Sequence, residues 1–180
     1  MKPVVIGILY RRRKNGQVQI LTQERLVQNH DYDPLYDHTL EVMGETLHEG
    51  ESVLDALIRG IQEECGVPEF EPLAICGADG KRLSLAEITY STGKDDYILE
   101  VEPFCFVQQL GKPQPWIGPV FLVHVDQDFE PDQSQNDGEA GEYKWCRPRE
   151  LLNLISEDPG NFMGLHMPAL KKAAKFFIND

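Results

Sequence analysis

The sequence predicts one α/β domain spanning residues 1–180, a three-layer α/β/α sandwich with a mixed β-sheet between helices. A chain of 180 residues is long enough for one well-packed domain of ordinary size. Its 41% of hydrophobic and 26% of charged residues are typical of a globular protein. Strand-like apolar runs are interleaved with stretches of helical periodicity in an irregular order, and this favours a mixed sheet.

The first part of the chain predicts a hairpin, a loop and a short strand. Strands are expected near residues 3–10 and 17–24, joined by a basic turn that contains glycine. A loop rich in Asp, Tyr and His, at about residues 27–38, leads to a short strand at residues 39–43. A helix is expected from about residue 51 to residue 65.

This helix is amphipathic. Its apolar residues recur at three- and four-residue spacing and predict one buried stripe: Val53, Leu54, Leu57, Ile58, Ile61 and Cys65. Arg59, Glu63 and Glu64 lie off that stripe, toward solvent or a cleft. Gly66 follows the last apolar position and is a C-terminal stop signal.

The second part of the chain predicts further strands and two helices. Strands are expected near residues 70–77, 84–91, 96–108, 119–126 and 143–146. Residues 127–142 read as an exposed acidic loop, because they show no apolar periodicity. Pro148 and Pro168 each open a helix, since proline suits the first helical turn.

The charge and the apolar pattern exclude several classes of partner. A formal net charge of −13 repels nucleic-acid backbones, so no nucleic-acid partner is expected. An anionic small substrate would also be repelled unless divalent cations lay between it and the carboxylates. No apolar run approaches bilayer-spanning length and the N-terminus lacks a signal-peptide pattern, so we expect no membrane partner and a cytoplasmic location. The 4 cysteines are scattered, and reduced thiols are expected.

The segment around the first helix resembles the Nudix box, whose family pattern is G-x(5)-E-x(7)-R-E-U-x-E-E-x-G-U, with U an aliphatic residue. The matching residues are Glu51, Arg59, Ile61, Glu63, Glu64 and Gly66. The turn before the helix also matches the family at Glu41, Gly44 and Gly50. Two positions depart from the pattern. Glu45 stands in place of the first glycine, and Gly60 stands in place of the glutamate after the arginine.

The resemblance implies a fold, a cofactor and a reaction. The family fold is a mixed sheet between helices, and the cofactor is Mg²⁺ or Mn²⁺, which takes carboxylate oxygens. The implied metal ligands are Glu63 and Glu64, which are also catalytic, while Arg59 holds strand and helix in register and Glu51 braces it. The implied reaction is hydrolysis of a diphosphate bond in a nucleoside diphosphate linked to another moiety.

The departure at Gly60 leaves the catalytic set open. A glycine inside a helix costs about 1 kcal/mol relative to alanine, so either room is needed there or a catalytic function has been lost. If a function has been lost, Gly60→Glu is expected to raise activity. Glu45 can offer the metal its backbone carbonyl or its carboxylate, or it can face solvent.

A carboxylate outside the box is the expected proton acceptor. Several Nudix proteins carry such a glutamate in the loop before a strand, and Glu139 is the candidate here, with Glu142 as the alternate. An ordinary acidic surface loop is the competing interpretation. Aromatic residues of the earlier loop either stack on a base or anchor that loop: His30, Tyr32, Tyr36 and His38.

A second function class also stays open. A Nudix-fold protein can bind a nucleotide or metabolite without hydrolysing it, and Gly60 is the feature that discriminates the two. In either case the expected partner is a small-molecule nucleoside diphosphate derivative, and a homodimer is left open.

Overall fold

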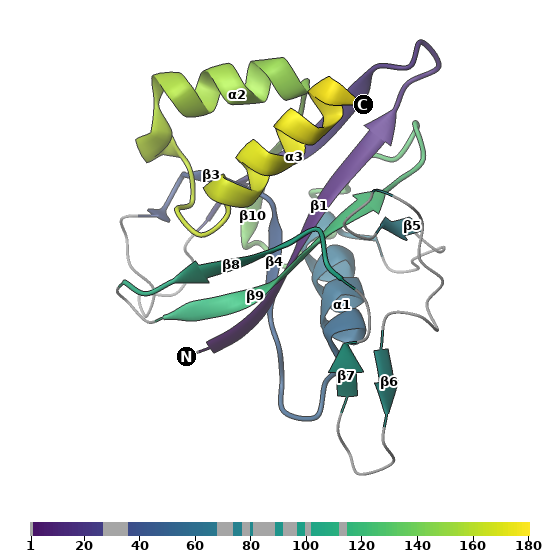
Figure 1. Ribbon diagram of the computed structural model, residues 1–180, viewed down its shortest axis with the longest axis vertical. Coiled ribbons are helices and arrows are strands. Elements are labelled where there is room, and N and C mark those ends of the chain that lie inside the picture. Colours follow the sequence, from purple (N-terminus) through teal and green to yellow (C-terminus); the bar gives the residue numbers. More distant parts are fainter. Residues whose placement is uncertain are drawn as a thin grey trace.

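A mixed β-sheet lies at the centre of the fold, with helices on both faces (Figure 1). The computed structural model describes residues 2–26, 36–67, 74–76, 80, 89–91, 97–99, 102–111 and 115–180. The sheet is built on β1 (Lys2–Arg12) and β9 (Trp116–His124), which run parallel to each other. The other pairings among the described strands are antiparallel.

The strand order along the main path is β10-β2-β1-β9-β5. Besides β1 and β9, this path contains β2 (Val18–Arg25), β5 (Ala74–Cys76) and β10 (Ala140–Cys146). Three strands pair at the side of this path, β3 with β2, β4 with β1 and β8 with β9: β3 (Leu40–Glu41), β4 (Met43–Thr46) and β8 (Cys105–Gln109). A separate two-stranded sheet consists of β6 (Thr89–Ser91) and β7 (Tyr97–Leu99).

Two apolar cores, one on each face of the sheet, make the three layers. The helices α2 (Pro148–Glu157) and α3 (Met167–Asn179), with the 3₁₀ turn η3 (Pro159–Asn161) between them, cover one face, and α1 (Val53–Cys65) covers the other. Successive residues of β1 serve opposite cores, as the pleat requires. Ile6 and Ile8 pack with α2 and α3, whereas Val5 and Leu9 pack with α1.

The structure confirms the predicted α/β sandwich but divides the strand predicted at residues 39–43. Residues 39–43 form two short strands because each half pairs with a different neighbour, β3 with β2 and β4 with β1. Val42, between them, donates its N–H to His166 Nδ1 at 3.3 Å instead of to a strand. This break turns the following residues toward α1 and so shapes the turn that precedes the helix.

Other predicted bounds of strands differ from the observed ones in the second half of the chain. The strand expected at residues 143–146 begins at Ala140, so Glu142 lies in β10 and not in the acidic loop. The strand expected over residues 96–108 is two strands, β7 and β8. Parts of the strands expected near residues 70–77 and 84–91 lie outside the described residues. Pro148 and Pro168 open α2 and α3 as predicted.

The cysteines are free thiols, as expected. Of the helices described, none has both the length and the apolar character to cross a membrane.

Candidate active site

The helix α1 is held at both ends by local hydrogen bonds. Ser52 caps its N-terminus by accepting the N–H of Asp55 at 3.1 Å. Gly66 ends it with φ 65° and donates its N–H to Gln62 O. Because the buried stripe faces the sheet, the opposite side of the helix is available for Arg59 and Glu63.

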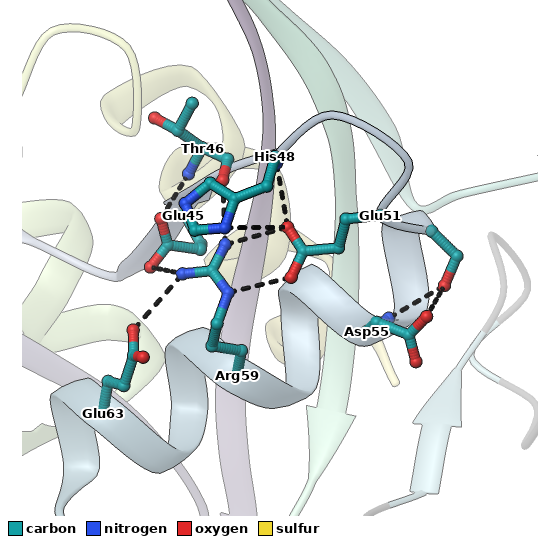
Figure 2. Close-up of polar contacts among 8 residues, drawn as sticks. Glu45, Thr46, His48, Glu51, Asp55, Arg59 and Glu63 are labelled. Atoms are coloured by element: carbon teal, nitrogen blue, oxygen red, sulfur yellow. Dashed lines mark hydrogen bonds and ion pairs between the residues drawn. The ribbon is translucent and has the colours of Figure 1, made fainter.

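Arg59 ties α1 to β4 and to the turn before the helix (Figure 2). Its Nε and Nη2 donate to the two oxygens of Glu51 at 2.8 and 2.9 Å, and Nη2 also donates to Thr46 O at 2.9 Å. Its Nη1 lies 2.9 Å from Glu45 Oε2 and 3.3 Å from Glu63 Oε2. These hydrogen bonds from Arg59 lower the pKa of the Glu51 carboxyl. The contacts are those that the expected supporting roles of Arg59 and Glu51 require.

The adjacent glutamates Glu63 and Glu64 have different surroundings. Glu63 is 46% exposed and its carboxylate contacts Arg59. Glu64 is buried, accepts a hydrogen bond from Gln23 Nε2, and accepts the N–H of Gly44 at 3.3 Å. Burial, together with the carboxylates of Glu41 and Glu45, raises the pKa of Glu64 well above its usual value. Glu64 therefore lies beneath the turn that precedes α1, and Glu63 lies at the surface of the helix.

A buried polar group lies behind this turn, on the side of β2 and β3. Arg25 Nη1 contacts the Glu41 carboxylate at 3.1 and 3.4 Å, and Glu41 Oε2 lies 3.8 Å from His166 Nδ1. Burial raises the pKa of Glu41, against the opposing effect of Arg25. Burial and the charge of Arg25 lower the pKa of His166 to about 3. The imidazole is therefore neutral, and since Nδ1 accepts the N–H of Val42, its proton is on Nε2.

Sequence reasoning did not find His166 or Arg25. His166 reaches the site from the start of α3, more than a hundred residues from the turn, and no motif surrounds it. The family pattern did indicate Glu41, which pairs with Arg25. Arg25 could have been anticipated from Glu41, because a buried carboxylate needs a partner of opposite charge.

The acidic loop is docked on the C-terminal end of α1. The N–H groups of Asp132 and Asp137 donate to Cys65 O at 2.8 Å and Glu63 O at 3.1 Å, and Tyr143 Oη donates to Glu64 O. These bonds satisfy carbonyls that the helix itself leaves unpaired. The loop is thus a specific cap on the box helix.

This docking brings Glu139 to the candidate site. Leu26 N–H donates to Glu139 O at 2.7 Å, and Glu139 N–H donates to Asp137 Oδ1 at 2.9 Å. Burial raises the pKa of the Glu139 carboxyl, and the charges of Asp137, Glu45 and Glu63 raise it further, against Arg25. Glu139 therefore shares the electrostatic environment of the box glutamates.

A cavity of about 460 Å³ opens beside the turn. Its polar lining includes Arg25, Glu45, Glu139 and His166. Its apolar lining consists of Val4, Ile6, Leu26, Leu47, Trp116, Met163 and Leu165. Glu142 is exposed on β10 and does not line this cavity. The mixture of lining groups suits a ligand with a charged part and an apolar, ring-like part.

The aromatic loop residues divide into two groups. Tyr36 packs against the core beside α2 and α3, and its Oη accepts a hydrogen bond from Gln109 Nε2 at 3.1 Å. His38 is exposed and paired with Glu24 at 2.6 Å. Both act as loop anchors here, and neither lines the cavity. His30 and Tyr32 lie outside the described residues.

The glutamates expected to bind a metal ion are not gathered into one compact cluster. Among the described residues, no three His, Cys, Asp or Glu side chains converge closely enough to hold a metal ion. Arg59 lies between Glu45 and Glu63 and holds both carboxylates (Figure 2). The side chains that surround the turn are nevertheless carboxylates, the oxygen donors that Mg²⁺ and Mn²⁺ prefer.

Solved structures with the same fold include several Nudix proteins. The binary complex of a C. elegans Ap4A hydrolase is 16% identical, with 100% of each chain covered and a TM-score of 0.62. RenU, a Nudix hydrolase from M. smegmatis, is 12% identical over 99% of this chain and 86% of that chain, with a TM-score of 0.62. The NUDIX domain of Shewanella oneidensis NrtR, complexed with ADP ribose, is 13% identical over 98% of this chain and 88% of that chain, with a TM-score of 0.56. At these identities the likeness shows the fold alone.

The comparison of sequences is more specific. No curated protein matched the sequence. A model of the NUDIX domain family matches residues 1–163, which include the box, the docked loop and every strand of the sheet. Such a match supports hydrolase activity of the Nudix type in general, for which divalent cations are the usual cofactors. With most of its length matched by this model, the chain belongs to the Nudix family.

Proposed function

We propose that the protein hydrolyses a diphosphate bond in a nucleoside diphosphate linked to another moiety, with Mg²⁺ or Mn²⁺ as cofactor. The observation that carries this proposal is the group of carboxylates on α1 and the turn before it, which lies beside a cavity. Glu63 lies at the surface of the helix end and Glu64 beneath the turn, so the two glutamates approach the turn from different sides.

The residues present fit a divalent cation by their chemistry and by their charge. Burial, with further contributions from neighbouring negative charges, raises the pKa values of Glu64, Glu41 and Glu139, and a bound cation would favour the charged forms of these carboxyls. Glu63 and Glu64 would hold the cation. When bound, it would neutralise phosphate oxygens and make water more acidic.

The protein's own groups have distinct tasks in this proposal. Glu139 accepts a proton from the attacking water, because it lines the cavity and its raised pKa makes it a better base. Arg59 and Glu51 keep α1 and β4 in register, so that the glutamates keep their positions. The apolar wall around Trp116 excludes water from the side of the cavity opposite the carboxylates.

The substrate class rests on the cavity and on the relatives. A volume of about 460 Å³ is in the ordinary range for small-ligand pockets. The similar structures carry Ap4A and ADP ribose in their names, and both compounds contain a nucleoside joined through phosphates to a second group. The same chemistry is the substrate class that we propose here.

A second function is binding of such a compound without turnover. Two observations favour it: Gly60 supplies no carboxylate, and Arg59 occupies an oxygen of Glu45 and of Glu63. If Arg59 retains both carboxylates when a ligand enters, the site binds the compound and does not hydrolyse it.

A hydrolysis screen distinguishes these functions. The protein would be incubated with nucleotide sugars, dinucleoside polyphosphates and nucleoside triphosphates, with Mg²⁺, with Mn²⁺ and with a chelator. Metal-dependent turnover that is lost in the Glu63→Gln/Glu64→Gln double variant supports the hydrolase. A compound that raises the melting temperature but is not turned over with either metal supports the binding protein. Neither binding nor turnover in any class refutes both.

A further inference from the structure

The two departures from the Nudix box are a reciprocal exchange of residue types. The family has glycine at the position of Glu45 and glutamate at the position of Gly60, and this chain has each residue at the other's place. The positions are fifteen residues apart in the sequence, which does not show whether the two departures are related. In the structure they are direct neighbours.

Gly60 lies on the face of α1 that packs against β4. A Cβ atom placed on Gly60 would lie 2.8 Å from Met43 Sδ, 2.9 Å from Glu45 Cβ and 3.4 Å from Glu45 Cγ. Real Cβ atoms essentially never approach a heavy atom that closely, so the side chains of Met43 and Glu45 together fill the space that a side chain at residue 60 would need. A side chain at residue 60 would therefore have to displace one or both of them. The expectation that Gly60→Glu alone would raise activity is therefore revised, because this site is packed.

The carboxylate of Glu45 points along α1 toward the site (Figure 2). Its Oε2 lies 2.9 Å from Arg59 Nη1, and its Oε1 accepts the N–H of Thr46 at 2.7 Å. The side chain is 18% exposed and lines the cavity with Glu139.

We propose that Glu45 supplies from β4 the carboxylate that the family pattern places on the helix at residue 60, and that Gly60 is small in order to admit it. This inference rests on the proposed function, since it assigns Glu45 to the cation site of that reaction. Because β4 packs against α1 at this point, Glu45 reaches from the strand the region that a glutamate at residue 60 would reach from the helix. The site then has the same number of carboxylates as the family pattern, but one of them lies on β4. Gly60 is then part of a working site, and it is not evidence of lost catalysis.

The exchange is tested by reversing it. Four proteins are compared: the wild type, Glu45→Gly, Gly60→Glu, and the double variant with both changes. Residues in direct contact are expected to show non-additive effects, and the proposal predicts their sign. Gly60→Glu alone should lower the melting temperature in the absence of metal, because its side chain meets Glu45 and Met43. The double variant should recover part of that loss, because the space used by Glu45 is vacated while Met43 stays in place.

Binding of Mn²⁺, followed by the electron paramagnetic resonance signal of the free ion, gives the second measurement. Glu45→Gly should weaken Mn²⁺ binding by about 10-fold or more, and the double variant should regain most of that affinity. Glu45→Gln keeps the side chain's volume and separates charge from packing; it should weaken Mn²⁺ binding by a similar factor. Glu142→Gln is the matched control, because it removes an exposed glutamate that does not line the cavity.

Each outcome has a distinct meaning. Wild-type Mn²⁺ affinity in Glu45→Gln would overturn the proposal and leave Glu45 as a packing and Arg59-binding residue only. A double variant no more stable than Gly60→Glu, and no better at binding Mn²⁺ than Glu45→Gly, would also overturn it. If the wild type neither binds Mn²⁺ nor hydrolyses any compound in the screen, the proposed function fails, and the exchange fails with it. If the wild type binds Mn²⁺ and the Glu45 variants do so equally well, the exchange alone fails.

Discussion

His166 makes the stability of this protein depend on pH in a predictable direction. Its ring is buried, Val42 donates to Nδ1, and the surrounding charges are those of Arg25 and Glu41. Burial and Arg25 lower its pKa from the ordinary value of 6.5 to about 3. Between these two values the unfolded chain binds a proton on His166 and the folded protein does not. The contribution of the neutral ring to stability is complete above about pH 6.5 and is lost progressively as the pH falls toward about 3.

The magnitude follows from the shift. One pH unit below the unfolded pKa, at about pH 5.5, the unfolded state is favoured by about 1.4 kcal/mol through this one group. A domain of ordinary stability has about 5–15 kcal/mol in total, so the effect is large enough to measure. Other groups titrate in the same range, and they are removed by comparison with a variant that lacks only the imidazole.

The variant is His166→Gln, whose carbonyl oxygen can still accept the N–H of Val42 but does not titrate. Urea unfolding of both proteins, followed by tryptophan fluorescence, would be measured at about pH 7.5 and about pH 5.5. Between these conditions the wild type should lose about 1.4 kcal/mol more free energy of unfolding than the variant. Equal losses in the two proteins would refute the reasoning, and would mean that His166 is protonated in the fold, paired with Glu41.

Three further predictions concern the candidate site. Glu139→Gln should lower kcat by about 10²- to 10⁴-fold with little change in KM, as loss of a general base would. An equal loss in Glu142→Gln would assign the effect to bulk charge. Arg59→Lys should lower the free energy of unfolding by about 1–3 kcal/mol in urea titrations, because an ammonium cannot bridge β4 and α1 as the guanidinium does; unchanged stability would contradict this. Mg²⁺ or Mn²⁺ should raise the melting temperature of the wild type but not of Glu63→Gln/Glu64→Gln, and a similar rise in both would remove these glutamates from the metal site.

The sequence predicted elements whose signals are local. The apolar spacing of α1 lies within the helix itself, and Pro148 and Pro168 each favour the start of a helix at their own position. The predicted bounds of these three helices therefore differ little from the observed ones. The division at Val42 was not predictable, because it depends on two different partner strands and on His166. A short strand is defined by what it pairs with, and that information is not in its own residues.

The same distinction applies to the site. The family resemblance anticipated the contact between Arg59 and Glu51, and the four-residue spacing within the helix anticipated the contact between Arg59 and Glu63. Spacing gave no indication that the side chain of Glu45 packs over Gly60, since a loop and a helix start separate the two residues. The sequence therefore left open whether Gly60 provides room or marks a lost function, and whether Glu45 faces the metal or solvent. The packing of β4 against α1 shows that the two positions are in contact.

Part of the excess of acid in this chain lies where a cation would be needed. Around the turn and the cavity the carboxylates outnumber the guanidinium groups of Arg25 and Arg59: Glu41, Glu45, Glu51, Glu63, Glu64 and Glu139. An imbalance of this kind destabilises the folded state unless it is compensated, and natural sequences retain such costs mainly at functional sites. A surface that carried negative charge only for solubility would place it where water screens it, as at Glu142. Glu64 and Glu41 are buried instead, and burial is the main cause that raises the pKa values of both carboxyls. A divalent cation bound at this turn would favour their charged forms.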